Sequence, residues 1–199
     1  MEAKPETLRI VPADWLHPLP LKELFGSDPA RPLEVDVGSG KGRFLLARAL
    51  AHPEVDFLGV DRMLRRIRKV DRKAIRAGLL NIRLLRVEAY YATAYFMPSD
   101  AISTYYIFFP DPWPKKRHHQ HRLFNPLFVD ALHRTLRVGG LVHFATDHLP
   151  YFDGVKEIMD ADVRFESVEP FVPTEEERTD FELYYVERTP IGRASWRRR

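Results

Sequence analysis

The chain has 199 residues, of which 45% are hydrophobic and 12% aromatic, as expected of one packed domain of about this length. It has no cysteine, which excludes disulfides, thiol nucleophiles and cysteine-ligated zinc, and it has no apolar signal core or membrane-length run, so we expect a soluble cytoplasmic protein. The formal net charge is only +3, but basic residues cluster at 62–76, 115–122 and 193–199, which indicates either an anionic partner or solvated helix faces.

In chain order, apolar segments alternate with longer mixed segments, a pattern typical of βαβ units and a largely parallel sheet. The predicted strands are 33–37, 56–60, 82–87, 104–109 and 141–145, and the predicted helices are 41–51, 62–77 and one that begins at Pro126 and ends at Gly139-Gly140. Segments 165–168 and 181–187 are predicted to finish the sheet as antiparallel strands. Residues 1–31 and 190–199 are expected to be flexible ends of a single domain.

A glycine-rich loop separates the first predicted strand from the first helix, at the sheet edge where nucleotide-like ligands bind. It is not a phosphate-binding P-loop, because its lysine is followed by Gly42 and not by serine or threonine. It is not a Gly-x-Gly-x-x-Gly dinucleotide motif, because the last position is Arg43. Asp36 lies two residues before Gly38-Ser39-Gly40, and this pattern resembles the first motif of S-adenosylmethionine-dependent methyltransferases, whose ligand carries cations in place of phosphates.

Acidic residues stand at the ends of the first three predicted strands, namely Asp36, Asp61 and Glu88. Asp61 has the position at which a carboxylate accepts hydrogen bonds from ribose hydroxyls, and Glu88 has one from which it can meet an adenine edge. Any one of them alone is equally well explained as a helix cap. Three in register predict a methyltransferase-type site for S-adenosylmethionine.

The fourth predicted strand runs into Pro110-Asp111-Pro112-Trp113-Pro114 and then into cations. Because proline favours extended geometry in the residue before it, Asp111 is expected to lie in a rigid, non-helical turn that faces the transferable methyl group. The alternative is a turn acid bonded to backbone N–H groups beside a packed Trp113. The cations that follow suit phosphate contact, and since they oppose a metal ion we expect no metal at the histidines among them.

The chain resembles the bacterial single-subunit tRNA (guanine-N7-)-methyltransferases over almost its whole length after about Pro32. The resemblance rests on Asp-Val-Gly-Ser-Gly-Lys-Gly, Phe-Leu-Gly-Val-Asp, Tyr-Tyr-Ile-Phe-Phe-Pro-Asp-Pro-Trp-Pro-Lys-Lys-Arg-His-His, Phe-Ala-Thr-Asp and Thr-Asp-Phe-Glu, of which the Pro-Asp-Pro-Trp segment is the most specific. It implies an α/β, Rossmann-like class I methyltransferase fold, with a mostly parallel seven-stranded sheet and helices on both faces. It also implies an enzyme that transfers a methyl group from S-adenosylmethionine to N7 of guanine at position 46 in the tRNA variable loop.

The same resemblance implies roles for individual residues. The cofactor-binding residues are Asp36, Gly38, Gly40, Asp61, Glu88 and Asp111, and Asp111 is also the catalytic acid. The substrate-binding residues are Lys115, Asp147, Thr179, Asp180, Phe181 and Glu182. The RNA-binding residues are Lys116, Arg117, His118, His119, Gln120, His121 and Arg122.

The chain departs from the family pattern in a few places. Gln120-His121-Arg122 stands where members often have Lys-Arg-Arg, and Asp180 stands where lysine is usual. Asp36 stands where glutamate is common and Glu88 where aspartate is common. Because these exchanges preserve charge, cofactor binding is expected to survive. The changes at 120–122 and 180 are expected to alter RNA affinity. The alternatives are a methyltransferase for a different substrate and a tRNA-binding protein of the same fold with weak activity.

Overall fold

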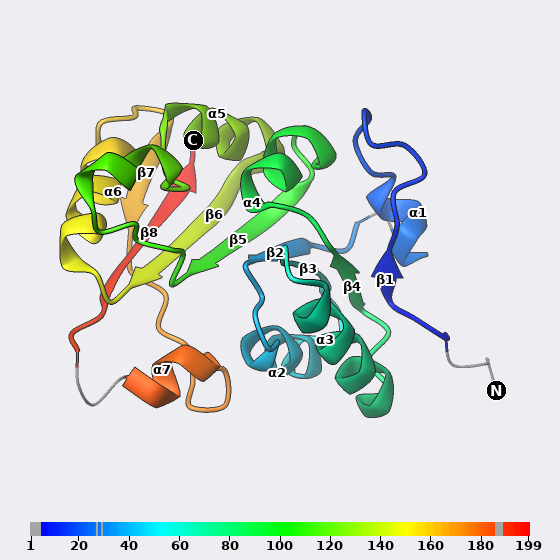
Figure 1. Ribbon diagram of the computed structural model, residues 1–199. Coiled ribbons are helices and arrows are strands. Elements are labelled where there is room, and N and C mark those ends of the chain that lie inside the picture. The colour runs from blue at the N-terminus through cyan, green and yellow to red at the C-terminus, as the bar shows by residue number, and fades with distance from the viewer. Residues whose placement is uncertain (1–4, 27, 29, 186–188) are drawn as a thin grey trace.

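The computed structural model describes residues 5–26, 28, 30–185 and 189–199, and within them helices cover both faces of one eight-stranded sheet (Figure 1). The strands are β1 (Arg9–Ile10), β2 (Leu33–Val37), β3 (Asp56–Val60), β4 (Ile82–Leu85), β5 (Ile102–Phe108), β6 (Leu136–Thr146), β7 (Phe165–Val168) and β8 (Gly192–Arg198). The helices are α1 (Leu21–Phe25), α2 (Arg43–Ala51), α3 (Leu64–Ala77), α4 (Ala89–Tyr91), α5 (Pro126–Thr135), α6 (Leu149–Asp160) and α7 (Asp180–Tyr185), with a π-helix at Ala92–Phe96 and a 3-10 helix at Lys116–His121.

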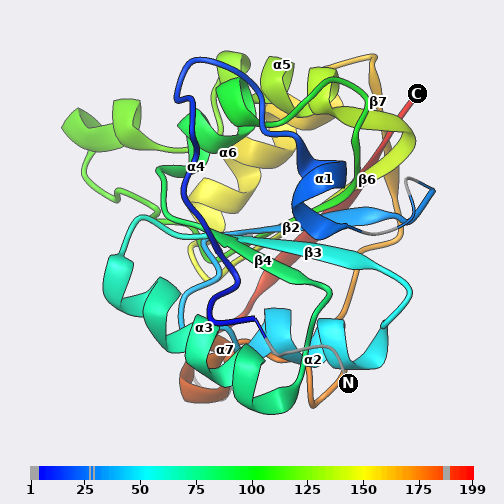
Figure 2. The same cartoon turned by 90° about the vertical axis from the view of Figure 1, so that its right-hand side faces the viewer.

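The central strands form the core of the sheet. The strand order is β1-β4-β3-β2-β5-β6-β8-β7; β8 is antiparallel to both of its neighbours, and every other pair is parallel. β2, β3 and β5 are buried along their whole length, because α2, α3 and α7 lie on one face of the sheet and α1, α4, α5 and α6 on the other (Figure 2). Parallel strands covered on both faces are expected to be largely apolar, and these are, with buried polar exceptions at Glu34, Asp36, Asp56, Ser103 and Thr104. Their carboxyl ends meet at one edge of the sheet.

The carboxyl-terminal part of the fold differs from the prediction. Residues 181–185, expected to be part of a strand, lie in helix α7, which begins at Asp180, and residues 186–187 of that predicted strand lie outside the described part of the chain. The helix begins with a reciprocal capping box, in which Thr179 and Glu182 each donate a backbone N–H to the other's side chain at 2.8 and 3.1 Å. Two such bonds favour a helix start over an extended strand.

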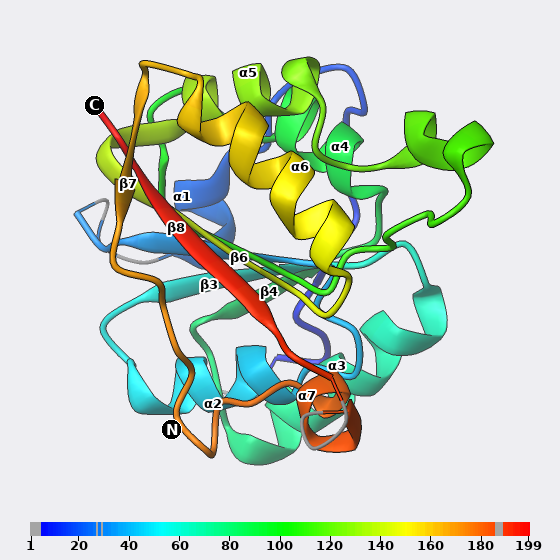
Figure 3. The ribbon, with the colours of Figure 1, turned by 90° about the vertical axis from the view of Figure 1, so that its left-hand side faces the viewer.

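The basic tail is an inner strand of the sheet and not a flexible end. β8 lies between β6 and β7 (Figure 3). Trp196 is only 1% exposed and its indole Nε1 donates to an Asp160 carboxylate oxygen at 2.7 Å. Burial of one large aromatic side chain with its polar atom satisfied accounts for the order of this segment.

Smaller differences concern the ends of elements. The helix expected to continue to Gly139 ends at Thr135, because the chain re-enters the sheet at Leu136, which is fully buried and pairs with Ile102. β4 ends at Leu85, two residues before the predicted end. The sheet also has one strand that the sequence did not predict, the two-residue β1. It pairs with β4 and lies within residues 1–31, for which flexibility is the expectation from sequence.

Candidate active site

A cavity of about 740 Å³ opens at the carboxyl edge of the sheet, between the loop after β2, the segment after β5 and helix α7. The residues that line it are Asp36, Gly38, Ser39, Gly40, Lys41, Arg43, Phe44, Arg66, Phe108, Phe109, Asp111, Thr179, Asp180, Phe181 and Tyr184. Segments far apart in the sequence therefore meet at the place that the strand-end pattern predicts for a ligand.

The glycine loop is shaped by its backbone. The N–H groups of Gly38 and Ser39 both donate to the carbonyl of Val60, at 2.8 and 2.9 Å, which ties the loop to the end of β3. Gly42 precedes α2 at a φ of 80°, and a Cβ there would lie 2.6 Å from a Val70 methyl carbon. Glycine is required at this position because α2 and α3 pack against each other through it.

Two buried carboxylates stand behind this loop in different environments. Asp61 accepts hydrogen bonds from the N–H groups of Gly40 and Met63, at 3.1 and 2.7 Å, and from the Arg66 guanidinium at 3.3 Å. The Asp36 carboxylate is 5% exposed and has no hydrogen-bond donor among the described residues. Burial, with a smaller contribution from the Asp61 charge, raises the pKa of Asp36 to about 7. A cationic ligand group in the cavity would relieve this unfavourable burial.

The segment after β5 holds an unusual backbone conformation. Phe109 has a φ of 52° and Trp113 a φ of 43°, so the expectation of extended geometry before each proline is wrong for both of these residues, which precede Pro110 and Pro114. Phe109 donates its N–H to Ala145 at 2.7 Å, and its ring stacks on Phe181 of α7 with centroids 4.6 Å apart. Left-handed non-glycine residues are strained and persist where their surroundings hold them, often at functional sites.

Asp111 lies outside helices and strands, as predicted, at the rim of the cavity. Its side chain is 70% exposed, and its nearest described cation is Arg62, with a guanidinium nitrogen 3.8 Å from a carboxylate oxygen. The carboxylate is thus open to the cavity and available to donors on a ligand.

The predicted substrate residues of α7 divide into two groups. Thr179, Asp180 and Phe181 line the cavity. Glu182 is 1% exposed and faces the protein, where it bonds to Thr179 and forms an ion pair with Arg193 of β8. In the described structure Glu182 therefore holds α7 in place and does not line the site.

Several other predicted residues do not line the cavity, and Asp61, which lies behind the glycine loop, is one of them. Glu88 caps α4 and accepts from the N–H groups of Tyr90 and Tyr91 at 3.0 and 2.9 Å, which is the alternative considered for a strand-end acid. Asp147 follows β6 at the same edge, half-buried, and Lys115 is exposed.

The predicted RNA-binding segment projects from the body of the protein. Lys116–His121 form a 3-10 helix with no buried residue, the green helix at the far left of Figure 2. Arg122 turns inward instead, donating its Nε to the Pro112 carbonyl at 2.9 Å and lying over the Tyr151 ring. Arg122 thus fixes the base of the segment, while its tip presents cations to solvent.

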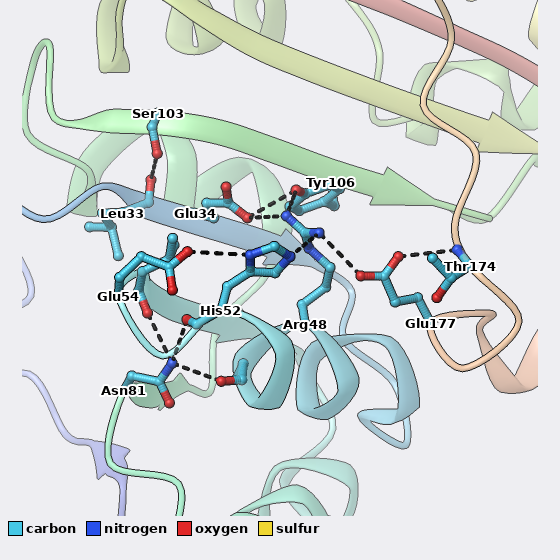
Figure 4. Close-up of polar contacts among 12 residues, drawn as sticks. Leu33, Glu34, Arg48, His52, Glu54, Asn81, Ser103, Tyr106, Thr174 and Glu177 are labelled. Atoms are coloured by element: carbon cyan, nitrogen blue, oxygen red, sulfur yellow. Dashed lines mark hydrogen bonds and ion pairs between the residues drawn. The ribbon is translucent and has the colours of Figure 1, made fainter.

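Sequence reasoning missed a buried polar cluster centred on Arg48 of α2, which Figure 4 shows. Its guanidinium reaches Glu34 of β2 at 3.3 Å, Tyr106 of β5 at 3.0 Å and Glu177 at 3.1 Å. Glu177 lies just before α7, so the cluster anchors the segment that carries Thr179 and its neighbours. These partners are 14 to 129 residues away from Arg48, so no local pattern announces the cluster.

We expect Glu177→Gln to lower the free energy of unfolding by about 2 kcal/mol, because it removes one of the charges that compensate the buried Arg48 guanidinium. Urea unfolding monitored by fluorescence measures this. Glu175→Gln is the matched control, since Glu175 is exposed and its ion pair with Arg178 is a surface pair worth about 1 kcal/mol or less. Equal effects of the two changes would contradict the anchoring role.

Comparison with known proteins identifies the family. A family model described as "Putative methyltransferase" matches residues 30–185. A tRNA (guanine-N(7)-)-methyltransferase of Halorhodospira halophila is 40% identical over 77% of this chain and 67% of its own length. The chain belongs to the tRNA (guanine-N7-)-methyltransferase family.

Other members of the tRNA (guanine-N7-)-methyltransferase family agree. The Nitrosococcus oceani protein is 38% identical over 83% of this chain and 70% of its own length. The Thermotoga maritima protein is 36% identical over 86% of this chain, which spans half the length of that relative.

Solved structures confirm the fold class that the family resemblance implied. The 16S rRNA methyltransferase KamB superposes with a TM-score of 0.63 at 15% identity, over 84% of this chain and 87% of that one. SMU.1697c, a Streptococcus mutans protein in complex with SAH, superposes with a TM-score of 0.57 at 12% identity, over 84% of this chain and 89% of that one. This family member thus has the class I methyltransferase fold, and its described residues form a sheet of eight strands where seven were expected. None of its described helices is long and apolar enough to cross a membrane.

Proposed function

We propose that this chain transfers the methyl group of S-adenosylmethionine to N7 of guanine at position 46 in the variable loop of tRNA. Family membership supports the enzyme class, the methyl donor and the tRNA substrate. The observation that carries the proposal is the place of Asp111 at the rim of a cavity that is also lined by the glycine loop and the buried Asp36. With tRNA as substrate, the reaction takes place in the cytoplasm.

The residues present fit the methyl donor. Asp36 offers a buried carboxylate whose raised pKa falls again when a cation binds beside it, as the amino group or sulfonium of S-adenosylmethionine would. Gly38 and Gly40 let the backbone approach the ligand closely, and Asp61 accepts from the ribose hydroxyls at the end of β3. Glu88 is not part of this fit, because its carboxylate caps α4 and does not line the cavity.

The chemistry makes modest demands on the protein. S-adenosylmethionine supplies an electrophilic methyl group on a sulfonium, and guanine N7 carries a free lone pair and no proton at neutral pH. The protein therefore needs no strong general base and has to align the base and exclude water. Positioning of this kind contributes roughly 7–11 kcal/mol.

The site residues divide these tasks among themselves. Asp111 accepts from the N1–H and the 2-amino group of guanine and so orients N7. The stacked rings of Phe109 and Phe181 give the base an aromatic wall. Thr179 and Asp180 contact the base or its ribose, with Asp147 at the same rim, and Lys115 with the 116–122 segment holds the backbone.

Radiolabelled methyl donor with two tRNA transcripts, one with guanine and one with adenine at position 46, tests the proposal. Label is expected in the guanine transcript alone. Equal label in both transcripts would assign the methyl group to another position. Binding of tRNA without transfer would leave only a tRNA-binding protein, and label in a non-RNA acceptor would assign another substrate.

A further inference from the structure

Helix α3 and the turn before it form the most basic surface segment of the chain outside the predicted RNA-binding residues. Residues 62–76 contain eight lysines and arginines and one acid, Asp71. A solvated helix usually gains support from acids placed three or four residues from its bases, and like charges at that spacing oppose the helix. Whether the surface of this helix is purely cationic therefore depends on where the Asp71 carboxylate lies.

Asp71 is not available to the surface. It is 6% exposed, and its two carboxylate oxygens accept from the Leu8 N–H at 2.8 Å and the Thr7 hydroxyl at 2.9 Å. The Arg9 guanidinium adds an ion pair at 3.2 Å. The acid is thus used to hold the amino-terminal segment with β1 against α3.

The outer face of α3 carries cations without partners. Arg65, Arg68 and Arg72 are exposed, and among the described residues none of them has an ion pair or a side-chain hydrogen bond. They line a hollow on the surface of the helix together with Arg9, Leu64 and Asp71, whose carboxylate is bonded to the amino-terminal segment. Spacings of three and four residues place the three side chains along one face, over about 10 Å of helix.

The face leads away from the active site. Just before α3, Arg62 pairs with Asp111, and within its first turn Arg66 lines the cavity. The views in Figures 2 and 3 both place the beginning of α3 at the same end of the molecule as the projecting 3-10 helix. A polyanion whose base enters the cavity therefore has cations on both sides, although Gln120 and His121 interrupt those on the 3-10 helix.

We propose that the Arg65, Arg68 and Arg72 face of α3 binds the phosphate backbone of the tRNA next to the base that enters the cavity. This inference rests on the proposed function for the identity of the polyanion. A chain of phosphates supplies the anions that the face lacks, and three regularly spaced guanidiniums suit successive phosphates without reading the sequence.

The test is the affinity of an unmodified tRNA transcript, measured without methyl donor at several salt concentrations, for the wild type and the Arg65→Ala/Arg68→Ala/Arg72→Ala variant. Affinity falls as salt rises, so the slope of log affinity against log salt is negative. Loss of three phosphate contacts is expected to make this slope shallower by about two and to weaken binding about tenfold. Arg137→Ala is the control, because Arg137 is an exposed arginine on β6 away from the cavity. We expect its slope to equal that of the wild type.

Alanine is a strong helix former, so the triple variant is expected to keep its melting temperature and its affinity for S-adenosylmethionine. An unchanged salt slope with affinity within twofold of the wild type overturns the inference, as does a wild type that does not bind tRNA. If the wild type binds tRNA and the variant shows the shallower salt dependence, the phosphate-binding role of this face is supported even when no guanine is methylated. In that case only the proposed reaction fails.

Discussion

Asp111→Asn is expected to lower the single-turnover rate of methyl transfer to tRNA by about 10²-fold. The carboxylate offers two acceptor oxygens to the paired donors on the guanine edge, whereas the amide offers one and turns an N–H group toward a donor. The loss falls on orientation of the base, because Asp111 lies at the rim of the cavity and its side chain is open to it. A misplacement of about 1 Å is enough for a loss of this size.

Rapid-quench measurement with saturating enzyme and methyl donor separates this step from binding. Asp153→Asn is the matched control, since Asp153 is an exposed acid on α6 away from the cavity, and we expect it to leave the rate unchanged. An Asp111→Asn variant that keeps the full single-turnover rate would refute the orienting role. A variant with a normal rate and weakened donor affinity would reassign Asp111 to the cofactor alone.

An element of this fold could be predicted from the sequence where residues close together in the chain determine its structure. β2, β3 and β5 are mainly apolar segments with a few buried polar side chains, of the kind that a parallel sheet buries, and they were predicted within two residues. The segment 181–185 is rich in aromatic residues, as strands are, yet the capping box at its start makes it a helix.

The last strand shows a signal that was present and outweighed. In β8 the apolar Ala194 and Trp196 point to a strand, but Ser195 between them is also fully buried, so the middle of the strand is covered on both faces and the burial does not alternate. The density of arginine suggested a solvated tail. Pairing with β6 and β7 makes this segment a strand, and those two partners lie earlier in the sequence, so no local pattern shows the pairing.

The candidate site divides along the same line. The positions of Asp36 and Asp111 at the cavity, and of Asp61 behind its glycine loop, could be predicted because strand ends in a parallel sheet meet at one edge, whatever the detailed packing. The Arg48 cluster could not, since its partners come together only in the finished fold. The sequence therefore predicts which carboxylates gather at this edge of the sheet better than it predicts which contacts hold the walls of the cavity.

Asp36→Asn is expected to weaken binding of S-adenosylmethionine more than tenfold while stabilising the ligand-free protein at pH 8. Burial raises the pKa of Asp36 to about 7 in the folded protein, from an ordinary value of 3.8. A group whose pKa is raised on folding contributes its full stability below pH 3.8 and loses that stability as the pH rises through 7. This difference between the folded and unfolded pKa values corresponds to at most about 4 kcal/mol in the free energy of unfolding.

The variant lacks this titration, so its free energy of unfolding should change less between pH 5 and pH 8 than that of the wild type. Because the buried amide has unsatisfied donors of its own, we expect a net gain of about 1–2 kcal/mol at pH 8. Urea unfolding of the ligand-free proteins at both pH values measures it. Asp61→Asn is the contrasting change, since it disturbs bonds to two backbone N–H groups and should destabilise at either pH.

Ligand addition distinguishes a binding carboxylate from one that is merely badly buried. Saturating S-adenosylmethionine places a cation beside Asp36, so the wild type should gain more stability from the ligand than Asp36→Asn does, and the gap at pH 8 should close or reverse. Equal ligand stabilisation in both proteins would mean that Asp36 does not face the bound cation. A wild type as pH-independent as the variant would mean that the carboxylate is already neutralised within the fold. In the expected case, the protein keeps an acid that weakens the empty fold because the methyl donor requires it.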